Sequence, residues 1–348
     1  MAPGALLIES PIEYAGFVDP LDHHRRCQVI TTPRVPKEVK DWRAGLKANG
    51  YAVVKNAIPH DRAVAYQKKA FDWISSFDRG LDIADPSTWT EEHLPIGSKN
   101  NLFRLYCVSH EKFVWDARME PGVLDAFAKL WGTEELLVSF DAINITFPNR
   151  ADKERLGGWE HVDQSPMRKG LHCVQGIINL SHAGPNDGGL VVYPGSHALV
   201  EEFFATQTDK STWKPRDFYM FDEEQLKFFT SRGLKPHKIC AEPGDLILWD
   251  SRTIHYGSEP EPSSNTIRMV IYAAYTPAKL AKPDALKVKA DIFNIWGCTT
   301  HWPHDNIVLK DQKTILGEGV VDPLSRDEPR EKPEVTDQLL KLAGVIPY

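Results

Sequence analysis

The sequence predicts an α+β protein, mainly β, in which N-terminal helices pack on an antiparallel sandwich or barrel. From about residue 134 to residue 277, short segments rich in Val, Ile and aromatic residues alternate with Gly, Pro, Asn and Asp, as in antiparallel β proteins. Before this region, apolar residues recur at helical spacing. No internal repeat, low-complexity tract or Gly/Ser linker divides the sequence, so we expect residues 1–348 to form a single domain.

The helical front is predicted over residues 36–133 and follows a turn-rich arm at residues 1–35. Helices are expected where apolar residues share one face and where Pro or Gly marks an end. A strand is expected where Val and Ile cluster between two such helices. The predicted elements are a helix at 36–49, a strand at 51–58, helices at 60–77 and 121–132, and a polar loop at 79–101.

The barrel core is predicted over residues 134–277, and a C-terminal extension follows at 278–348. Helical inserts are expected at about 196–207 and 222–231, and a short helix at 335–344. The predicted strands of the core are 137–147, 170–180, 189–194, 245–249 and 266–275.

Composition and charge exclude several classes of protein. Hydrophobic residues make up 42 % and charged residues 26 % of the 348 residues, as in globular proteins and unlike disordered or collagen-like chains. The net charge of −7 excludes a basic nucleic-acid-binding surface. The five cysteines form no CxxC pair, which disfavours a disulfide framework and a cysteine zinc site. No signal peptide and no apolar run of ~18 residues is present, so we expect a cytoplasmic protein without membrane contact.

The strongest chemical signal is the pair His161 and Asp163. Alternate residues of a strand project from the same face, so an imidazole and a carboxylate would point together. With one further histidine they would complete the 2-His-1-carboxylate arrangement that binds non-haem Fe(II). Taken alone, the His161-Val162-Asp163 segment also fits a histidine at a strand edge beside a solvated aspartate.

Two downstream residues strengthen this interpretation. A turn at 243–245 leads into an apolar strand, and His255 follows that strand. Thirteen residues later, Arg268 shares a strand face with Val270 and Tyr272. An arginine on an apolar face is costly unless an anion pairs with it, and its planar fork suits a carboxylate.

In combination these motifs resemble the Fe(II)/2-oxoglutarate-dependent dioxygenases, and among them the phytanoyl-CoA dioxygenase family. The segments NDGGLVVYPGSH (186–197) and WDSRTIHYGS (249–258) are similar to signatures of that family. The resemblance covers residues 137–277 and, more weakly, residues 49–58. It implies a double-stranded β-helix, the jelly-roll or cupin-like barrel, in which Fe(II), 2-oxoglutarate and O2 react.

Carried over to this sequence, the resemblance implies that His161, Asp163 and His255 are the iron ligands. It implies that Arg268 pairs with the distal carboxylate of 2-oxoglutarate. Gln175 is expected on the strand beside the cosubstrate, and Asn144 and Thr146 near its keto-acid end. For these last three residues, ordinary polarity of a barrel lining is the alternative.

Residues that contact the substrate are less well marked. Arg104 is expected to bind an anionic group, with a structural salt bridge as the alternative. The apolar chain end is expected to fold over the barrel mouth and to place Ile346 and Tyr348 near the substrate. The alternatives are a distant apolar groove and a subunit interface. Residues 301–305 (HWPHD) are expected to form a surface turn rather than a second metal site.

We expect the protein to oxidise an unactivated C–H bond of a small specialised metabolite by hydroxylation, desaturation or oxidative cyclisation, with release of succinate and CO2. A free amino acid is the alternative substrate. A catalytically inactive binding barrel and a cupin that needs no cosubstrate are the alternative classes. The acidic chain and the absence of a peroxisomal address disfavour an acyl-CoA. A homodimer is the default oligomeric state, although no apolar stripe demands it.

Overall fold

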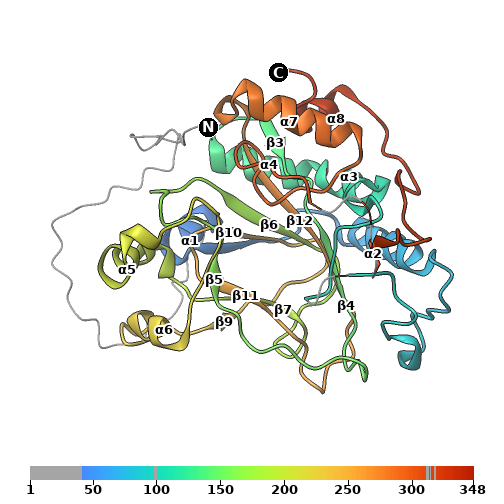
Figure 1. Ribbon diagram of the computed structural model, residues 1–348, viewed down its shortest axis with the longest axis horizontal. Helices are drawn as coiled ribbons and strands as arrows, with labels where there is room; N and C mark the ends of the chain where they lie inside the picture. Colours follow the sequence, from blue (N-terminus) through green and yellow to red (C-terminus); the bar gives the residue numbers. More distant parts are fainter. Residues whose placement is uncertain (1–40, 98–99, 311–312, 314, 317–318) are drawn as a thin grey trace.

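A computed structural model describes residues 41–97, 100–310, 313, 315–316 and 319–348 (Figure 1). The predicted arm and the start of the predicted helix at 36–49 lie outside these residues. The described chain forms two mainly antiparallel sheets flanked by helices, which confirms the α+β, mainly β prediction. None of the described helices combines the length and the apolar character needed to cross a membrane.

The larger sheet carries the predicted strands except the one at 189–194, which forms β7 of the smaller sheet. Its order is β1-β10-β6-β12-β4-β2, and β3 pairs with the far end of β12. The central strands β10, β6 and β12 are buried almost throughout, which explains their nearly continuous apolar sequence. The bounds are β1 Tyr51–Val54, β2 Leu102–Phe103, β3 Leu136–Val138, β4 Ile143–Thr146, β6 Val174–Asn179, β10 Leu246–Asp250 and β12 Arg268–Pro277.

The smaller sheet has the order β8-β5-β11-β7-β9. Its strands are β5 His161–Val162, β7 Gly189–Val192, β8 Tyr219–Met220, β9 His237–Lys238 and β11 His255–Ser258. The two sheets pack face to face, because Ile177 and Val270 of the larger sheet share one buried cluster with Leu190 and Val192 of the smaller sheet. Polar residues at one end of this interface form the site described below.

Most helices gather on one side of the larger sheet, and two helices, at residues 200–207 and 223–230, pack beside the smaller sheet (Figure 1). Helix α1 (Trp42–Asn49) begins where the Asp41 side chain accepts the Arg43 N–H, and it ends at Gly50, whose φ of 80° suits glycine. Helices α3 and α7 were not predicted from the sequence. The remaining helices are α2 His60–Ser75, α3 Lys112–Arg118, α4 Pro121–Trp131, α5 Val200–Gln207, α6 Glu223–Thr230, α7 Pro283–Asn294 and α8 Asp337–Leu342.

Two predicted strands are shorter than expected. The segment 137–147 is divided into β3 and β4, because Phe140 leaves the sheet and exchanges two hydrogen bonds with Thr299. The segment 51–58 ends as a strand at Val54, since Asn56 adopts a φ of 53° and donates its N–H to the Asp245 carboxylate. In both places a contact distant in sequence decides where the strand ends.

Candidate active site

Three candidate metal ligands converge between the two sheets. His161 and His255 face each other in the β5–β11 register, and Asp163 follows two residues after His161. Ligand atoms of all three lie within 4.8 Å of one another. The Nε2 atom of His255 lies 3.2 Å from Asp163 Oδ2, and the Nε2 atom of His161 lies 3.7 Å from Asp163 Oδ1. The structure therefore brings together the three residues that the sequence grouped.

The backbone selects the imidazole tautomer that a metal needs. The Nδ1 atom of His161 is 2.9 Å from the Trp159 carbonyl, and the Nδ1 atom of His255 is 2.8 Å from the Thr253 carbonyl. A carbonyl only accepts hydrogen bonds, so each Nδ1 carries the proton. Each Nε2 then presents a lone pair to the cluster, as in most protein metal sites.

The charge states also suit a cation. Burial lowers the pKa of His161 to about 4, so its imidazole is neutral at physiological pH. Burial alone would raise the pKa of Asp163, but the neighbouring His161, His301 and His255 outweigh burial and hold that pKa below its ordinary value. One carboxylate and two imidazole nitrogens are the donor set of a non-haem Fe(II) site.

Neighbouring side chains fix two of the three candidate ligands, Asp163 and His161, in place. Gln175 on β6 donates its Nε2 hydrogen to Asp163 Oδ2 at 2.9 Å. Trp159 stacks on the His161 ring at a centroid distance of 4.3 Å and an interplanar angle of 9°, and Phe218 lies 5.2 Å from the same ring. Gln175 lines the same cavity as the candidate ligands, and its predicted place beside the cosubstrate stays a prediction.

A second polar group lies on β12 and β4. Arg268 is 5 % exposed, and its Nη1 donates to Asn144 Oδ1 at 2.6 Å. Thr146 donates its hydroxyl to the same Asn144 oxygen at 2.9 Å and lies opposite Arg268 in the strand register. Because Asn144 is neutral, the charge of Arg268 has no carboxylate partner among the described side chains and remains available to an anion.

One cavity of about 600 Å³ connects these groups. A cavity of this size suits a small-molecule ligand. The wall includes Arg104, whose charge favours the ionised form of the neighbouring Asp141 carboxyl, which also lines the cavity. The predicted residues that line the cavity are His161, Asp163, His255, Arg268, Gln175, Asn144, Thr146 and Arg104.

The prediction for the chain end differs from the structure. Ile346 and Tyr348 are not among the residues that line the cavity. Tyr348 donates its hydroxyl to the Leu136 carbonyl at 2.6 Å, at the end of β3 where helix α8 also packs. The apolar tail therefore covers this edge of the larger sheet instead of the barrel mouth.

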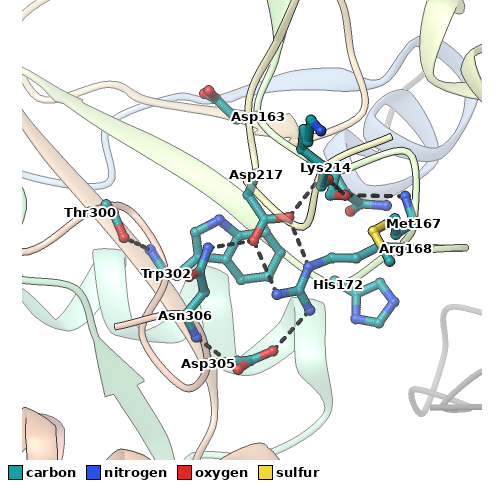
Figure 2. Close-up of polar contacts among 12 residues, drawn as sticks. Asp163, Met167, Arg168, His172, Lys214, Asp217, Thr300, Trp302, Asp305 and Asn306 are labelled. Atoms are coloured by element: carbon teal, nitrogen blue, oxygen red, sulfur yellow. Dashed lines mark hydrogen bonds and ion pairs between the residues drawn. The ribbon is translucent and has the colours of Figure 1, made fainter. Parts of the chain in front are cut away.

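A segment that was expected to be a surface turn forms part of the cavity wall. Trp302 is 1 % exposed and His304 is 6 % exposed, and His301 lines the cavity with its Nε2 3.4 Å from the Asp163 carbonyl. Asp217, from the segment before β8, also lines the cavity and binds Arg168 (Figure 2). The only sequence signal for this wall was the tryptophan and the two histidines within residues 301–305.

Comparisons with known proteins agree with this geometry. The sequence profile of the phytanoyl-CoA dioxygenase (PhyH) family matches residues 46–270. The chain is 42 % identical to Ava biosynthesis cluster protein O of Aspergillus versicolor over 284 residues, which is 80 % of this chain and 90 % of that protein.

Two solved structures resemble the fold at low sequence identity. Hypothetical protein JW0805 of Escherichia coli has a TM-score of 0.53 at 15 % identity, covering 76 % of this chain and 75 % of that one. The GlcNAc Inducible Gene 2 protein of Candida albicans has a TM-score of 0.50 at 13 % identity, covering 72 % of this chain and 66 % of that one. At these identities the likeness concerns the fold alone.

Proposed function

We propose that this chain, which belongs to the phytanoyl-CoA dioxygenase family, is an Fe(II)/2-oxoglutarate-dependent oxygenase whose iron is held by His161, Asp163 and His255. The observation that carries the proposal is the convergence of two Nε2 lone pairs and one carboxylate within 4.8 Å. The face-to-face sheets, with both histidines on the smaller one, are consistent with the double-stranded β-helix of such enzymes.

The remaining polar residues have distinct roles in this proposal. Bound iron, with 2-oxoglutarate and O2, would supply the oxidising power, and succinate and CO2 would be the by-products. Arg268 binds the distal carboxylate of 2-oxoglutarate, and Asn144 and Thr146 orient its guanidinium. Gln175 holds Asp163 in its ligand position.

The proposed substrate is a small specialised metabolite that undergoes hydroxylation, desaturation or oxidative cyclisation at an unactivated C–H bond. The size of the cavity and the relationship to a protein of a biosynthesis cluster support this proposal. A free amino acid is the second candidate, because Arg104 and Asp141 both line the cavity and could bind a carboxylate and an ammonium group. An inactive binding barrel is disfavoured by the complete donor set.

The first experiment measures turnover directly. The protein is loaded with Fe(II) and 2-oxoglutarate without oxygen, then exposed to O2 with panels of specialised metabolites and of free amino acids. We expect succinate release that depends on iron, and a compound whose mass changes by loss of two hydrogens or gain of one oxygen. Absence of both 2-oxoglutarate binding and succinate would contradict the proposed function.

Arg268 provides the sharpest single-residue test. Replacement by Met removes the charge that pairs with 2-oxoglutarate, and a hydrogen bond to a charged group contributes about 1.5–3 kcal/mol. We therefore expect Arg268→Met to raise the half-saturating 2-oxoglutarate concentration by about 10- to 100-fold. The matched control is Arg232→Met, since Arg232 stacks on Phe228 on helix α6, away from the cavity. Equal half-saturation in both variants would contradict the role of Arg268.

A further inference from the structure

The C-terminal extension contributes a wall of the proposed active site. Residues 298–306, here called the strap, lie beyond the family match at 46–270. Six strap residues line the cavity together with the candidate metal ligands: Cys298, Thr299, Thr300, His301, Trp302 and Asn306.

The first end of the strap is attached to the larger sheet. The Thr299 N–H donates to the Phe140 carbonyl at 2.8 Å, and the Phe140 N–H donates to the Thr299 hydroxyl at 3.0 Å. Two residues later, His301 Nε2 lies 3.4 Å from the carbonyl of Asp163. The strap therefore runs from the break between β3 and β4 to the loop that carries a candidate iron ligand.

The second end is held by polar contacts of Arg168 (Figure 2), a residue that is not among those that line the cavity. Its Nε and Nη2 bind the two oxygens of Asp217 at 2.8 and 3.0 Å, and its Nη1 binds Asp305 at 2.9 Å. The guanidinium also lies over the Trp302 ring, 4.5 Å from the centroid. All three nitrogens of the planar guanidinium donate a hydrogen bond, an arrangement that lysine could not reproduce.

Asp217 holds together the strap, the loop after Asp163 and the segment before β8. Its side chain is 2 % exposed and also accepts the Asn306 Nδ2 hydrogen at 2.7 Å and the Ser165 N–H at 2.9 Å. These contacts thus combine the three segments. Removing one partner of such a buried pair leaves the other charge uncompensated, so the arrangement has one strongly preferred geometry.

We propose that Arg168 is a positioning residue, which fixes the strap in the cavity wall so that His301 contacts the substrate beside the metal. The inference rests on the proposed function for the identity of the metal site. Arg168 acts through Asp217, Asp305 and Trp302, whereas His301 is the residue that touches the substrate. Sequence variation in the strap is then expected to change substrate choice while Fe(II) and 2-oxoglutarate binding persist.

The test maps which residues lie near bound iron, with Fe(II) and hydrogen peroxide as the probe. Peroxide oxidises side chains close to the metal, and mass spectrometry of peptides identifies them. We expect oxidation at His161, His255 and His301 in the wild type. In Arg168→Met, oxidation at His301 should fall severalfold relative to oxidation at His161. The extent of oxidation at His161 and at His255 should be unchanged. Arg168→Lys should lie between the two, and Arg232→Met should match the wild type.

Hydrogen exchange of the same variants provides a second readout that needs no metal. Loss of one partner of a buried ion pair costs more than the ~1.4 kcal/mol that corresponds to a tenfold change, so strap peptides of Arg168→Met should exchange about tenfold faster or more. If Arg168→Met does not fold, Asp305→Asn removes one contact at a side chain that is 50 % exposed, and should act in the same direction.

Different results would contradict the positioning role of Arg168 and the proposed iron site. Unchanged strap exchange and an unchanged ratio of His301 to His161 oxidation in Arg168→Met would overturn the positioning role. Faster exchange spread evenly over the whole chain would also overturn it, because it would show a general loss of stability. If wild-type His161 and His255 are not oxidised, the proposed iron site is contradicted, and the exchange measurement still decides whether Arg168 holds the strap.

Discussion

Asp163 depends on a residue of the opposite sheet. Gln175 donates to Asp163 Oδ2 at 2.9 Å, and its Nε2 also lies 3.5 Å from the Ser251 hydroxyl. Partners of metal ligands typically change metal affinity by about 10- to 100-fold when they are removed. We expect Gln175→Leu to weaken Fe(II) binding by a factor in this range, measured by anaerobic titration. Gln164→Leu is the matched control, since the buried Gln164 amide donates to the Gly170 carbonyl instead. Equal affinities in the two variants would contradict this role.

At the residue scale, the sequence predicted contacts that follow from strand geometry. His161 and Asp163 meet because alternate residues of an extended chain share a face. The hydrogen bond between Arg268 and Asn144 was not predicted, because it depends on which strands are neighbours in the sheet. The orientation of Gln175 toward Asp163 was missed, because side-chain direction depends on the packing of one sheet against the other. His301 was missed because no local periodicity reports the path of a loop.

At the element scale, the strap begins beside a buried histidine. His110 Nε2 lies 2.9 Å from the Gly297 carbonyl, so that nitrogen carries the proton, while Nδ1 accepts the Trp115 indole N–H at 3.2 Å. A second proton would turn Nδ1 into a donor facing another donor. Accordingly, burial lowers the pKa of His110 to about 3.

This histidine predicts a pH dependence of stability. The pKa of His110 is lower in the folded chain than the ~6.5 of an unfolded chain, so the unfolded state binds more protons between these values. Stability should therefore fall as the pH decreases from about 6.5 toward 3. His110→Gln, which keeps a donor and an acceptor without titrating, should lose less stability over that window in denaturant titrations. The same pH slope in variant and wild type would refute this account.

The chain end provides a contrasting prediction at the same scale. The Tyr348 hydroxyl bonds the Leu136 carbonyl at the edge of the larger sheet, away from the cavity wall. Tyr348→Phe removes that hydrogen bond and should lower the free energy of unfolding by about 1 kcal/mol. Succinate release should be unchanged, because the residue does not line the cavity. A change in succinate release at unchanged stability would support the original expectation that the tail contacts the substrate.

Elements were predictable where a local signal determines them. Helix α1 was predicted to stop at Gly50 and helix α4 at Gly132, and both glycines adopt the positive φ that ends a helix. The division of 137–147 and the burial of the strap were not predictable, since both result from the pairing of Phe140 with Thr299 across about 160 residues. Local periodicity contains no information about such contacts.

At the scale of the whole molecule, bound metal should link the two sheets. Its candidate ligands lie on and beside β5 and β11 of the smaller sheet, while Gln175 and Arg268 of the larger sheet hold a ligand and the proposed cosubstrate. A ligand that binds only the folded state stabilises it by about 2.7 kcal/mol at a concentration 100 times its dissociation constant. Fe(II) with 2-oxoglutarate should therefore raise the thermal midpoint, and a chelator should reverse the effect. Asp163→Ala should abolish the shift, since two imidazoles remain without their carboxylate. An equal shift in Asp163→Ala would mean that the cation binds elsewhere, and the assignment of this centre would then be wrong.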